Sequence, residues 1–228
     1  MNSRGQRSFA DLPGFAAKLY DSLTRTRAMQ CQYREIAADL ASRIDRGRIL
    51  DVGAGPGHLL AELRHLSPAF ELYGLDISAS MVELARRQLA GLGIDCRLGT
   101  IEHSGYDGNF FNLVTCTGSF YLWDSPRQCL DEVFRILKPG SSAFLFESHR
   151  DCDQAHVLNA LKTNLKGENL LRRVIAPRLF LKQLGMTYRT DEVAAIILET
   201  RFARSYAIDR IRLAQVPAWM RIRLTKQA

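Results

Sequence analysis

The hydrophobic residues of this chain follow two patterns that alternate several times along the sequence. Short apolar runs predict strands, and stretches with an apolar residue every three or four positions predict amphipathic helices between them. The runs that predict the first five strands cover residues 48–52, 71–76, 95–99, 112–117 and 142–147. Strands and helices that alternate with such short connections are typical of an α/β fold whose parallel sheet has helices on both faces.

Two helix boundaries can be placed from local signals. Apolar residues at helical spacing predict one helix across residues 11–46, ended by Gly47. Ser80 is followed three positions later by Glu83, and this capping box predicts the start of the helix after the second strand.

The pattern changes after the fifth strand. Residues 151–189 predict a helical insertion, in which Pro177 interrupts the second apolar stretch. Another helix follows, and the runs at 204–213 and 218–225 predict two closing strands joined at Pro217.

Length and composition narrow the class of protein. A chain of 228 residues is long enough for one α/β domain and too short for two enzyme-sized domains. With 46% hydrophobic and 24% charged residues, it is neither disordered nor collagen-like nor a disulfide scaffold. It contains no apolar run of membrane-spanning length and no secretory signal at its start. Five cysteines without a C-x-x-C pair predict reduced thiols, a cytoplasmic location and no structural metal site.

The net charge of +7 is distributed unevenly. Residues 49–149 carry seven Lys or Arg against twelve Asp or Glu, whereas residues 150–189 carry eight against three. The basic flanks suit an anionic substrate, a nucleic acid or an anionic membrane surface, and they are equally consistent with an ordinary solvated surface.

A glycine-rich turn gives the first indication of a ligand. The first predicted strand ends at Asp51 and turns through Gly53, Gly55 and Gly57 into a helix, at the sheet edge where open α/β sheets bind ligands. Asp76 ends the second strand, where its carboxylate can accept hydrogen bonds from two vicinal ribose hydroxyls. Together these features predict a ligand that contains a nucleoside.

The spacing of the glycines distinguishes two nucleoside ligands. A dinucleotide site requires G-x-G-x-x-G, with N–H groups free for a diphosphate, but here His58 takes the place of the third glycine and Pro56 has no N–H. Asp51 is badly placed beside a diphosphate, whereas its carboxylate suits an ammonium group and tolerates a sulfonium. The loop therefore favours S-adenosylmethionine over NAD.

These residues also carry a family resemblance. The segment Ile49-Leu-Asp-Val-Gly-Ala-Gly-Pro-Gly57 resembles motif I of the class I S-adenosylmethionine-dependent methyltransferases. Tyr73-Gly-Leu-Asp-Ile-Ser78 is similar to the family's acidic-loop segment, and Leu137-Lys-Pro-Gly140 is a frequent family feature. The resemblance covers roughly residues 33–147, and the closing helix and strands fit the family's antiparallel strand pair.

The resemblance implies the fold and its organisation. Residues 1–228 are expected to form a single methyltransferase domain, built on a Rossmann-like seven-stranded, mostly parallel sheet with helices on both faces and the last strand antiparallel. Residues 11–46 are expected to form an N-terminal helical cap. Residues 151–189 are expected to lie over the active site, where an insertion would set specificity.

The resemblance also implies which residues bind S-adenosylmethionine. The methionine part of the cofactor would be surrounded by the loop residues Asp51, Gly53, Ala54, Gly55 and Gly57. The adenosine part would contact Asp76 at the ribose and Ile77, Met81, Thr100 and Ile101 at the adenine. Thr100 departs from the family, which usually has an acid there, although its hydroxyl can still accept a hydrogen bond from the adenine amino group.

Further site residues are expected at the ends of the fourth and fifth strands. The backbone of Cys116 and Thr117 would meet the amino group of the cofactor, with Phe120 nearby. His149 is the first candidate for a general base, and Tyr20 could close over the cofactor. His103, after the third strand, is the second candidate for a base, and Glu147 and Tyr20 are weaker candidates.

The sequence thus predicts an S-adenosylmethionine-dependent methyltransferase acting on O, N or C of a small-molecule acceptor, which could be anionic. One alternative is an RNA methyltransferase of the tRNA type that uses the basic flanks. Against it, Thr117-Gly-Ser-Phe-Tyr121 lacks the Asn/Asp-Pro-Pro-aromatic signature of enzymes that methylate planar amino groups. A second alternative is a protein that binds the cofactor without catalysis. The sequence leaves the oligomeric state open.

Overall fold

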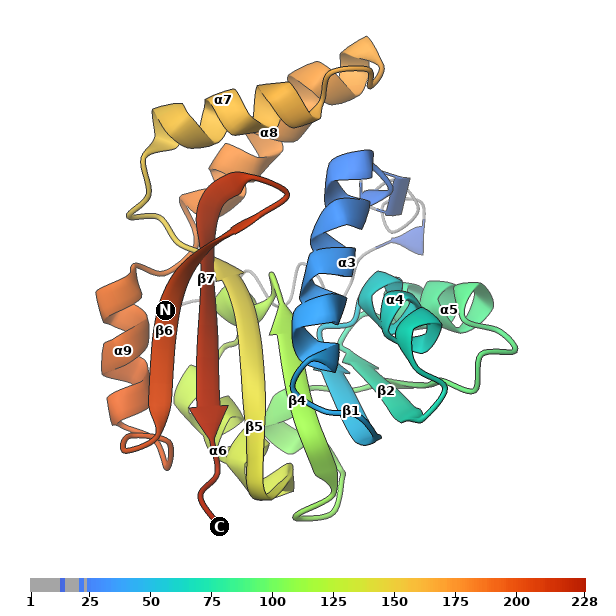
Figure 1. Ribbon diagram of the computed structural model, residues 1–228, viewed down its shortest axis with the longest axis vertical. Helices are drawn as coiled ribbons and strands as arrows, with labels where there is room; N and C mark the ends of the chain where they lie inside the picture. The colour runs from blue at the N-terminus through green and yellow to red at the C-terminus, as the bar shows by residue number, and fades with distance from the viewer. Residues whose placement is uncertain (1–12, 15–20, 23) are drawn as a thin grey trace.

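A seven-stranded sheet forms the centre of the molecule (Figure 1). The computed structural model describes residues 13–14, 21–22 and 24–228. The strands follow the order β3-β2-β1-β4-β5-β7-β6, and β7 pairs antiparallel with both β5 and β6 while the first five strands pair in parallel. This confirms the predicted sheet. The strands are β1 Gly47–Val52, β2 Phe70–Asp76, β3 Asp95–Leu98, β4 Phe111–Thr117, β5 Leu137–Ser148, β6 Tyr206–Leu213 and β7 Val216–Thr225.

Helices cover both faces of this sheet, as the alternating pattern predicts. On β1, Ile49 packs in the hydrophobic cluster that contains α3, α4 and α5, whereas the next residue, Leu50, packs in the cluster that contains α6 and α9. Because successive side chains of a strand point to opposite faces and both faces are covered, neighbouring residues of this strand are both apolar. The helices are α3 Arg27–Ala41, α4 His58–Leu66, α5 Ala79–Gln88, α6 Pro126–Ile136, α7 Gln154–Asn164, α8 Leu170–Leu184 and α9 Thr190–Leu198, with short 3₁₀ turns η1 Ile101–His103 and η2 Phe120–Leu122.

The order of the strands determines where a ligand can bind. The chain runs outward in opposite directions from the neighbouring strands β1 and β4, so their carboxyl ends open a crevice between the connections on the two faces. Helices α7 and α8 lie above this edge of the sheet (Figure 1). Within the part of the chain that the structure describes, no helix has the length and hydropathy of a membrane span.

The single helix predicted across residues 11–46 and the predicted start of α5 are both wrong. A single helix across residues 11–46 is not formed, because Thr26 caps a new helix, α3, which ends at Ala41. Ser78 rather than Ser80 caps α5, with an extended backbone and a hydroxyl that accepts the N–H of the third residue on. Because Ser78 has the geometry of a helix cap, α5 begins two positions earlier than the capping box predicts.

Two prolines do not have the effect that the sequence predicts. Helix α8 runs through Pro177, which is buried against the domain, so packing offsets the missing backbone hydrogen bond. Pro217 lies inside β7, before its first pair with β5. The turn between β6 and β7 is formed instead by Ala214 and Gln215, both with positive φ.

This turn provides a test of the hairpin geometry. Ala214 and Gln215 have φ of 46° and 64°, a conformation that side-chain-bearing residues disfavour. Replacing Gln215 by Gly is expected to raise the free energy of unfolding by about 0.5–1 kcal/mol, measured by denaturant unfolding. The control Gln30→Gly, at an exposed position of α3, is expected to lower it by about 0.7–1 kcal/mol. A loss of stability in Gln215→Gly would contradict this account of the turn.

Candidate cofactor and acceptor site

The loop after β1 takes its shape from three glycines. Gly53, Gly55 and Gly57 have φ of 72°, 52° and 85°, in the left-handed region that favours glycine. At Gly53 there is a second requirement, because a Cβ atom there would lie 2.2 Å from Oγ of Ser119 in the turn after β4. The loop therefore lies directly against the end of β4.

The backbone N–H groups of this loop are already used within the protein. Four of the five residues 53–57 donate their N–H to an oxygen of the chain, and the fifth, Pro56, has none. The bonds are Gly53 N to Leu75 O at 2.7 Å, Ala54 N to Leu75 O at 3.2 Å, Gly55 N to Asp76 Oδ2 at 2.8 Å and Gly57 N to Ala54 O at 2.9 Å. The loop thus has no free N–H for a phosphate oxygen.

Asp76 joins the loop to the next strand. Its Oδ2 accepts the N–H of Gly55, and its Oδ1 accepts the N–H of Ser78 at 2.9 Å. Burial raises the pKa of this carboxyl group, against the lowering effect of the two backbone donors. Each carboxylate oxygen keeps a further lone pair, and Asp76 is one of the residues that line the pocket.

Asp51 is a second buried carboxyl group close to the loop. It lies at the end of β1, and its Oδ1 has no hydrogen-bond partner among the described residues. Burial, and then the charge of Asp76, raise the pKa of Asp51 to about 8. A buried carboxylate without a partner is costly, so this position favours a cation nearby.

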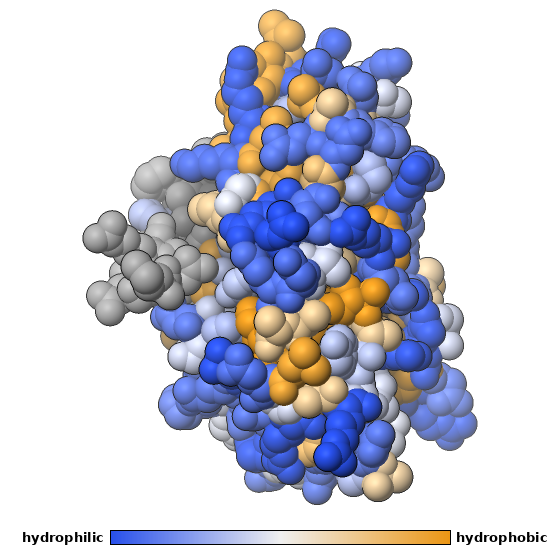
Figure 2. All heavy atoms as spheres, turned by 90° about the vertical axis from the view of Figure 1, so that its left-hand side faces the viewer, coloured by the Kyte–Doolittle hydropathy of each residue, from blue (hydrophilic) through white to orange (hydrophobic). Residues whose placement is uncertain are grey.

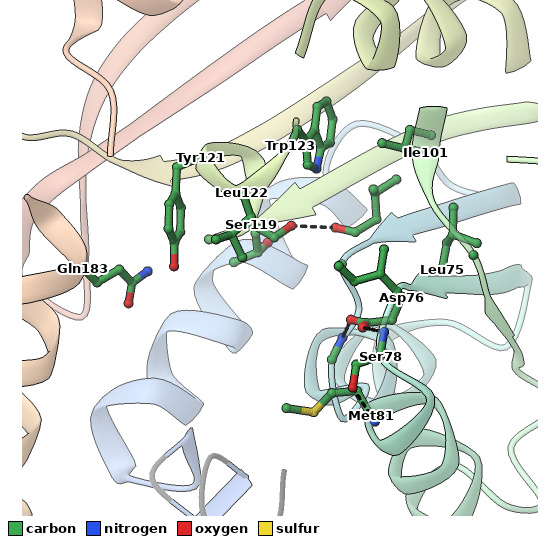
Figure 3. A pocket seen from close by; sticks show the side chains of 17 residues that line it. Leu75, Asp76, Ser78, Met81, Ile101, Ser119, Tyr121, Leu122, Trp123 and Gln183 are labelled. Atoms are coloured by element: carbon green, nitrogen blue, oxygen red, sulfur yellow. Dashed lines mark hydrogen bonds between the residues drawn. The ribbon is translucent and has the colours of Figure 1, made fainter. Parts of the chain in front are cut away.

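A pocket opens where β1 and β4 separate (Figure 3). It is lined by part of the set that the sequence predicts, namely Gly53, Gly55, Asp76, Ile77, Met81, Ile101 and Thr117. Met81 and Asp76 lie at one end of the pocket, while Tyr121 and Gln183 point toward each other at the other end (Figure 3). The pocket therefore has one end at β2 and a separate end at Gln183 of α8.

Several lining residues were not predicted. They come from the turn after β4, from η2 and from the insertion: Ser119, Tyr121, Leu122, Trp123 and Gln183. The first four lie in or beside the segment 117–121, of which the sequence predicted only Thr117 and Phe120 as site residues. Gln183 has no local signal, because only the fold brings α8 over the sheet edge.

Two predicted residues lie in the core instead of the pocket lining. Cys116 is buried, with its Sγ 3.0 Å from Oγ of Ser119. Phe120 is buried with its ring 5.0 Å from that of Trp123 and 5.4 Å from that of Tyr188. Both side chains pack in the core beneath the turn after β4, and contact Ser119 and Trp123 there. Two loop residues, Ala54 and Gly57, and the buried Asp51 are also absent from the lining.

Thr100 makes a different contact from the one expected. Its hydroxyl accepts the N–H of Glu102 at 3.1 Å, which caps η1, and also donates to the Glu102 carboxylate. The hydroxyl is thus engaged within its own turn, and Thr100 does not line the pocket. The next residue, Ile101, does line it.

None of the predicted catalytic residues that the structure describes lines the pocket. Tyr20 lies outside the described residues. His149 is buried, donates its backbone N–H to the Ala218 carbonyl oxygen and has Nδ1 2.9 Å from Oδ1 of Asp151. Glu147 is buried behind η2, and burial raises its pKa to about 8. His103 is exposed at the end of η1.

Asp151 fixes both ends of the insertion. Besides the His149 ring, its carboxylate accepts the N–H and the hydroxyl of Thr190 at 3.2 and 3.3 Å and pairs with Arg210 on β6. Burial alone would raise the pKa of Asp151, but the hydrogen bonds from His149 and Thr190 outweigh it, so the pKa lies below its ordinary value. The insertion begins and ends at one anchored point.

The insertion also contacts the N-terminal segment. The Arg172 guanidinium of α8 donates to the Ser22 carbonyl oxygen at 2.9 Å. Next to it, Asp21 lies 3.0 Å from Nε2 of His58, the first residue of α4 after the glycine loop. Burial, more than any other cause, lowers the pKa of this histidine. Insertion and N-terminal segment thus meet beside the glycine loop.

Comparison with known proteins agrees with this geometry. Residues 50–145 match the family model described as methyltransferase domain. The chain is 30% identical over 111 residues, 48% of its length, to the uncharacterised methyltransferase YdaC of Bacillus subtilis, and covers 61% of that protein. It is 31% identical over 146 residues, 62% of its length, to the demethylmenaquinone methyltransferase of Deinococcus radiodurans, and covers 59% of that protein. The chain thus spans about three fifths of the length of these curated relatives.

A solved structure shares the whole fold. The plantazolicin methyltransferase BamL, in complex with a triazolic desmethylPZN analog and SAH, superposes with a TM-score of 0.74 at 14% sequence identity. The match covers 98% of this chain and 94% of BamL. The likeness therefore includes α7 and α8 as well as the sheet. The residues of the methyltransferase-domain match carry the glycine loop, Asp76 and η2, so the match covers most of the elements that form the pocket.

Proposed function

We propose that the protein transfers a methyl group from S-adenosylmethionine to O, N or C of a small-molecule acceptor. The observation that carries the proposal is the glycine loop, whose N–H groups are all donated within the chain while Asp51 and Asp76 lie beside it. A dinucleotide would bring two negative phosphates to a loop without free donors and next to two carboxyl groups. A cationic adenosyl ligand without phosphates suits the same surroundings.

The residues around the pocket suggest how the cofactor is held. We assign its ammonium group to Asp51, whose Oδ1 has no partner among the described residues, and its ribose hydroxyls to Asp76. We assign its adenine to the apolar side chains of Ile77, Met81 and Ile101. When bound, the sulfonium of the cofactor supplies an activated methyl group.

The end of the pocket below α8 is where we place the acceptor. Leu122 and Trp123 give this end an apolar wall, and Tyr121 and Gln183 bring a hydroxyl and an amide to it (Figure 3). An acceptor with an apolar body and one polar group would fit such a wall. One relative is named as a methyltransferase of demethylmenaquinone and BamL as one of plantazolicin, so these two proteins act on a small molecule or a peptide.

The chain's own contribution to the reaction is alignment and the exclusion of water. The apolar wall at η2 and the roof formed by α8 would keep water away from the acceptor. A general base is required only when the accepting atom must lose a proton. The roles predicted for His149 and Tyr20 stay predictions, and the Asp151 contact makes His149 part of the anchor of the insertion.

Calorimetry and turnover test the proposal together. We expect S-adenosylmethionine and S-adenosylhomocysteine to bind the purified chain and NAD to give no heat of binding. With a panel of small apolar acceptors and bulk tRNA, methyl transfer is expected to a member of the small-molecule set. Binding of NAD would contradict the cofactor assignment, and methylation of tRNA alone would contradict the acceptor class.

The role of Asp76 gives a quantitative prediction. Asp76→Asn is expected to weaken binding of S-adenosylmethionine by about 1–3 kcal/mol, because the charge-assisted bonds to the ribose are lost. Calorimetry measures the change. The control Asp95→Asn, at an exposed position at the start of β3, should bind normally. Equal affinities of Asp76→Asn and the unchanged protein for S-adenosylmethionine would contradict the assignment of the ribose hydroxyls to Asp76.

The raised pKa of Asp51 predicts a pH dependence of cofactor binding. Its pKa is about 8 in the free protein, and a cationic ligand favours the ionised carboxylate. The affinity for S-adenosylmethionine is therefore expected to increase between about pH 6 and pH 8, by up to about tenfold per pH unit, with uptake of the cofactor releasing a proton. Asp51→Asn should bind weakly and without this dependence. A flat profile for the unchanged protein would contradict the assignment of Asp51.

A further inference from the structure

Helix α8 carries buried apolar side chains in its second half and exposed ones in its first turns. In the second half, Pro177 and Leu184 are buried, and the ring of Phe180 lies 6.4 Å from that of Trp219 on β7. Where a surface helix is not packed on its domain, it normally presents polar residues to water. The first turns of α8 do not.

The exposed apolar residues at the start of this helix are Leu170, Leu171 and Val174, here called the α8 tip. Their exposed fractions are 74%, 68% and 43%. Their spacing places them on one face, and Arg172 between them points away, with its guanidinium bonded to Glu168 and to the N-terminal segment. Figure 2 shows hydrophobic side chains among hydrophilic ones at the upper end of the molecule, where Figure 1 places α7 and α8.

Positive charge accompanies the α8 tip. Within residues 154–184, six Lys or Arg stand against one acidic residue, Glu168, which pairs with Arg172. Arg178 and Lys182 follow Val174 at intervals of four and continue its exposed face. The other basic side chains of the two helices and their connection are Lys162, Lys166 and Arg173. Apart from Arg172, no basic side chain of this set forms an ion pair with a described residue.

We infer that the α8 tip inserts into the headgroup region of an anionic lipid bilayer while the basic side chains of α7 and α8 contact lipid phosphates. The combination of exposed leucines with uncompensated cations is what such an interface binds. A nucleic acid would match the charge but leave the leucines in water. A second copy of the chain would cover the leucines but bring two cationic hairpins together.

This docking would orient the pocket toward the membrane. Gln183, which lines the acceptor end of the pocket, lies on the same helix as Leu170, about 20 Å further along at 1.5 Å per residue. Asp151 and Thr190 hold the base of the α7–α8 hairpin to the domain, at the end opposite the α8 tip. Helix α8 thus connects the lipid surface to the pocket. Lipid binding itself does not depend on which acceptor is methylated.

Co-sedimentation of the full chain with vesicles tests the inference. We expect binding to phosphatidylcholine vesicles that contain about 30% phosphatidylglycerol, weaker binding to pure phosphatidylcholine, and a decrease with added salt. Leu170→Ser combined with Leu171→Ser should lower the partition coefficient at least about tenfold. The matched pair Leu66→Ser and Leu198→Ser, with 53% and 56% exposure, should leave it unchanged.

A charge variant provides an independent measurement. Arg173→Ser combined with Arg178→Ser should lower partition to the anionic vesicles about fivefold per charge and leave that to neutral vesicles nearly unchanged. The inference is overturned if anionic vesicles bind no protein or if both leucine pairs lose binding equally. It is also overturned if light scattering finds a dimer in the unchanged protein and a monomer in the tip variant. The same holds if the protein binds tRNA and not vesicles, and the charge variant loses the tRNA complex.

Discussion

The pocket depends on one carboxylate that ties together the ends of two parallel strands. Asp76, the last residue of β2, accepts the N–H of Gly55 in the loop after β1 and the N–H of Ser78, which caps α5. These bonds fix the loop, the start of the helix and the floor of the pocket at once. They also remove the N–H of Gly55 as an anion-binding group, so the same contact that shapes the site determines the charge of the ligand it accepts.

A second constraint is the burial of Asp51 beside this carboxylate. Burial favours the neutral form of this acidic group, and the charge of Asp76 repels a second negative charge, which is why the pKa of Asp51 rises to about 8. The fold retains a buried oxygen without a partner among the described residues, one position before the lining residue Val52. Such a group lowers the stability of the free protein and is favourable once a cation lies next to it.

The insertion connects the interior of the site to the surface of the molecule. Asp151 holds its two ends together through Thr190 and the His149 ring, so α7 and α8 extend from a fixed base. The inner face of α8 then packs on the domain and brings Gln183 to the pocket, while its first turns remain exposed. A single helix thus lines one end of the pocket and presents an apolar, cationic surface outside.

The sequence by itself determined the sheet, the glycine loop and the position of Asp76, because these depend on local periodicity and on backbone conformations that few residue types adopt. It did not determine that the Thr100 hydroxyl is engaged with its own turn, that Phe120 lies in the core, or that Gln183 reaches the pocket. Each of these depends on how a side chain meets groups that only the folded chain brings near. The spacing of residues along the chain specifies elements, whereas the contacts between elements distant in sequence decide which side chains face the ligand.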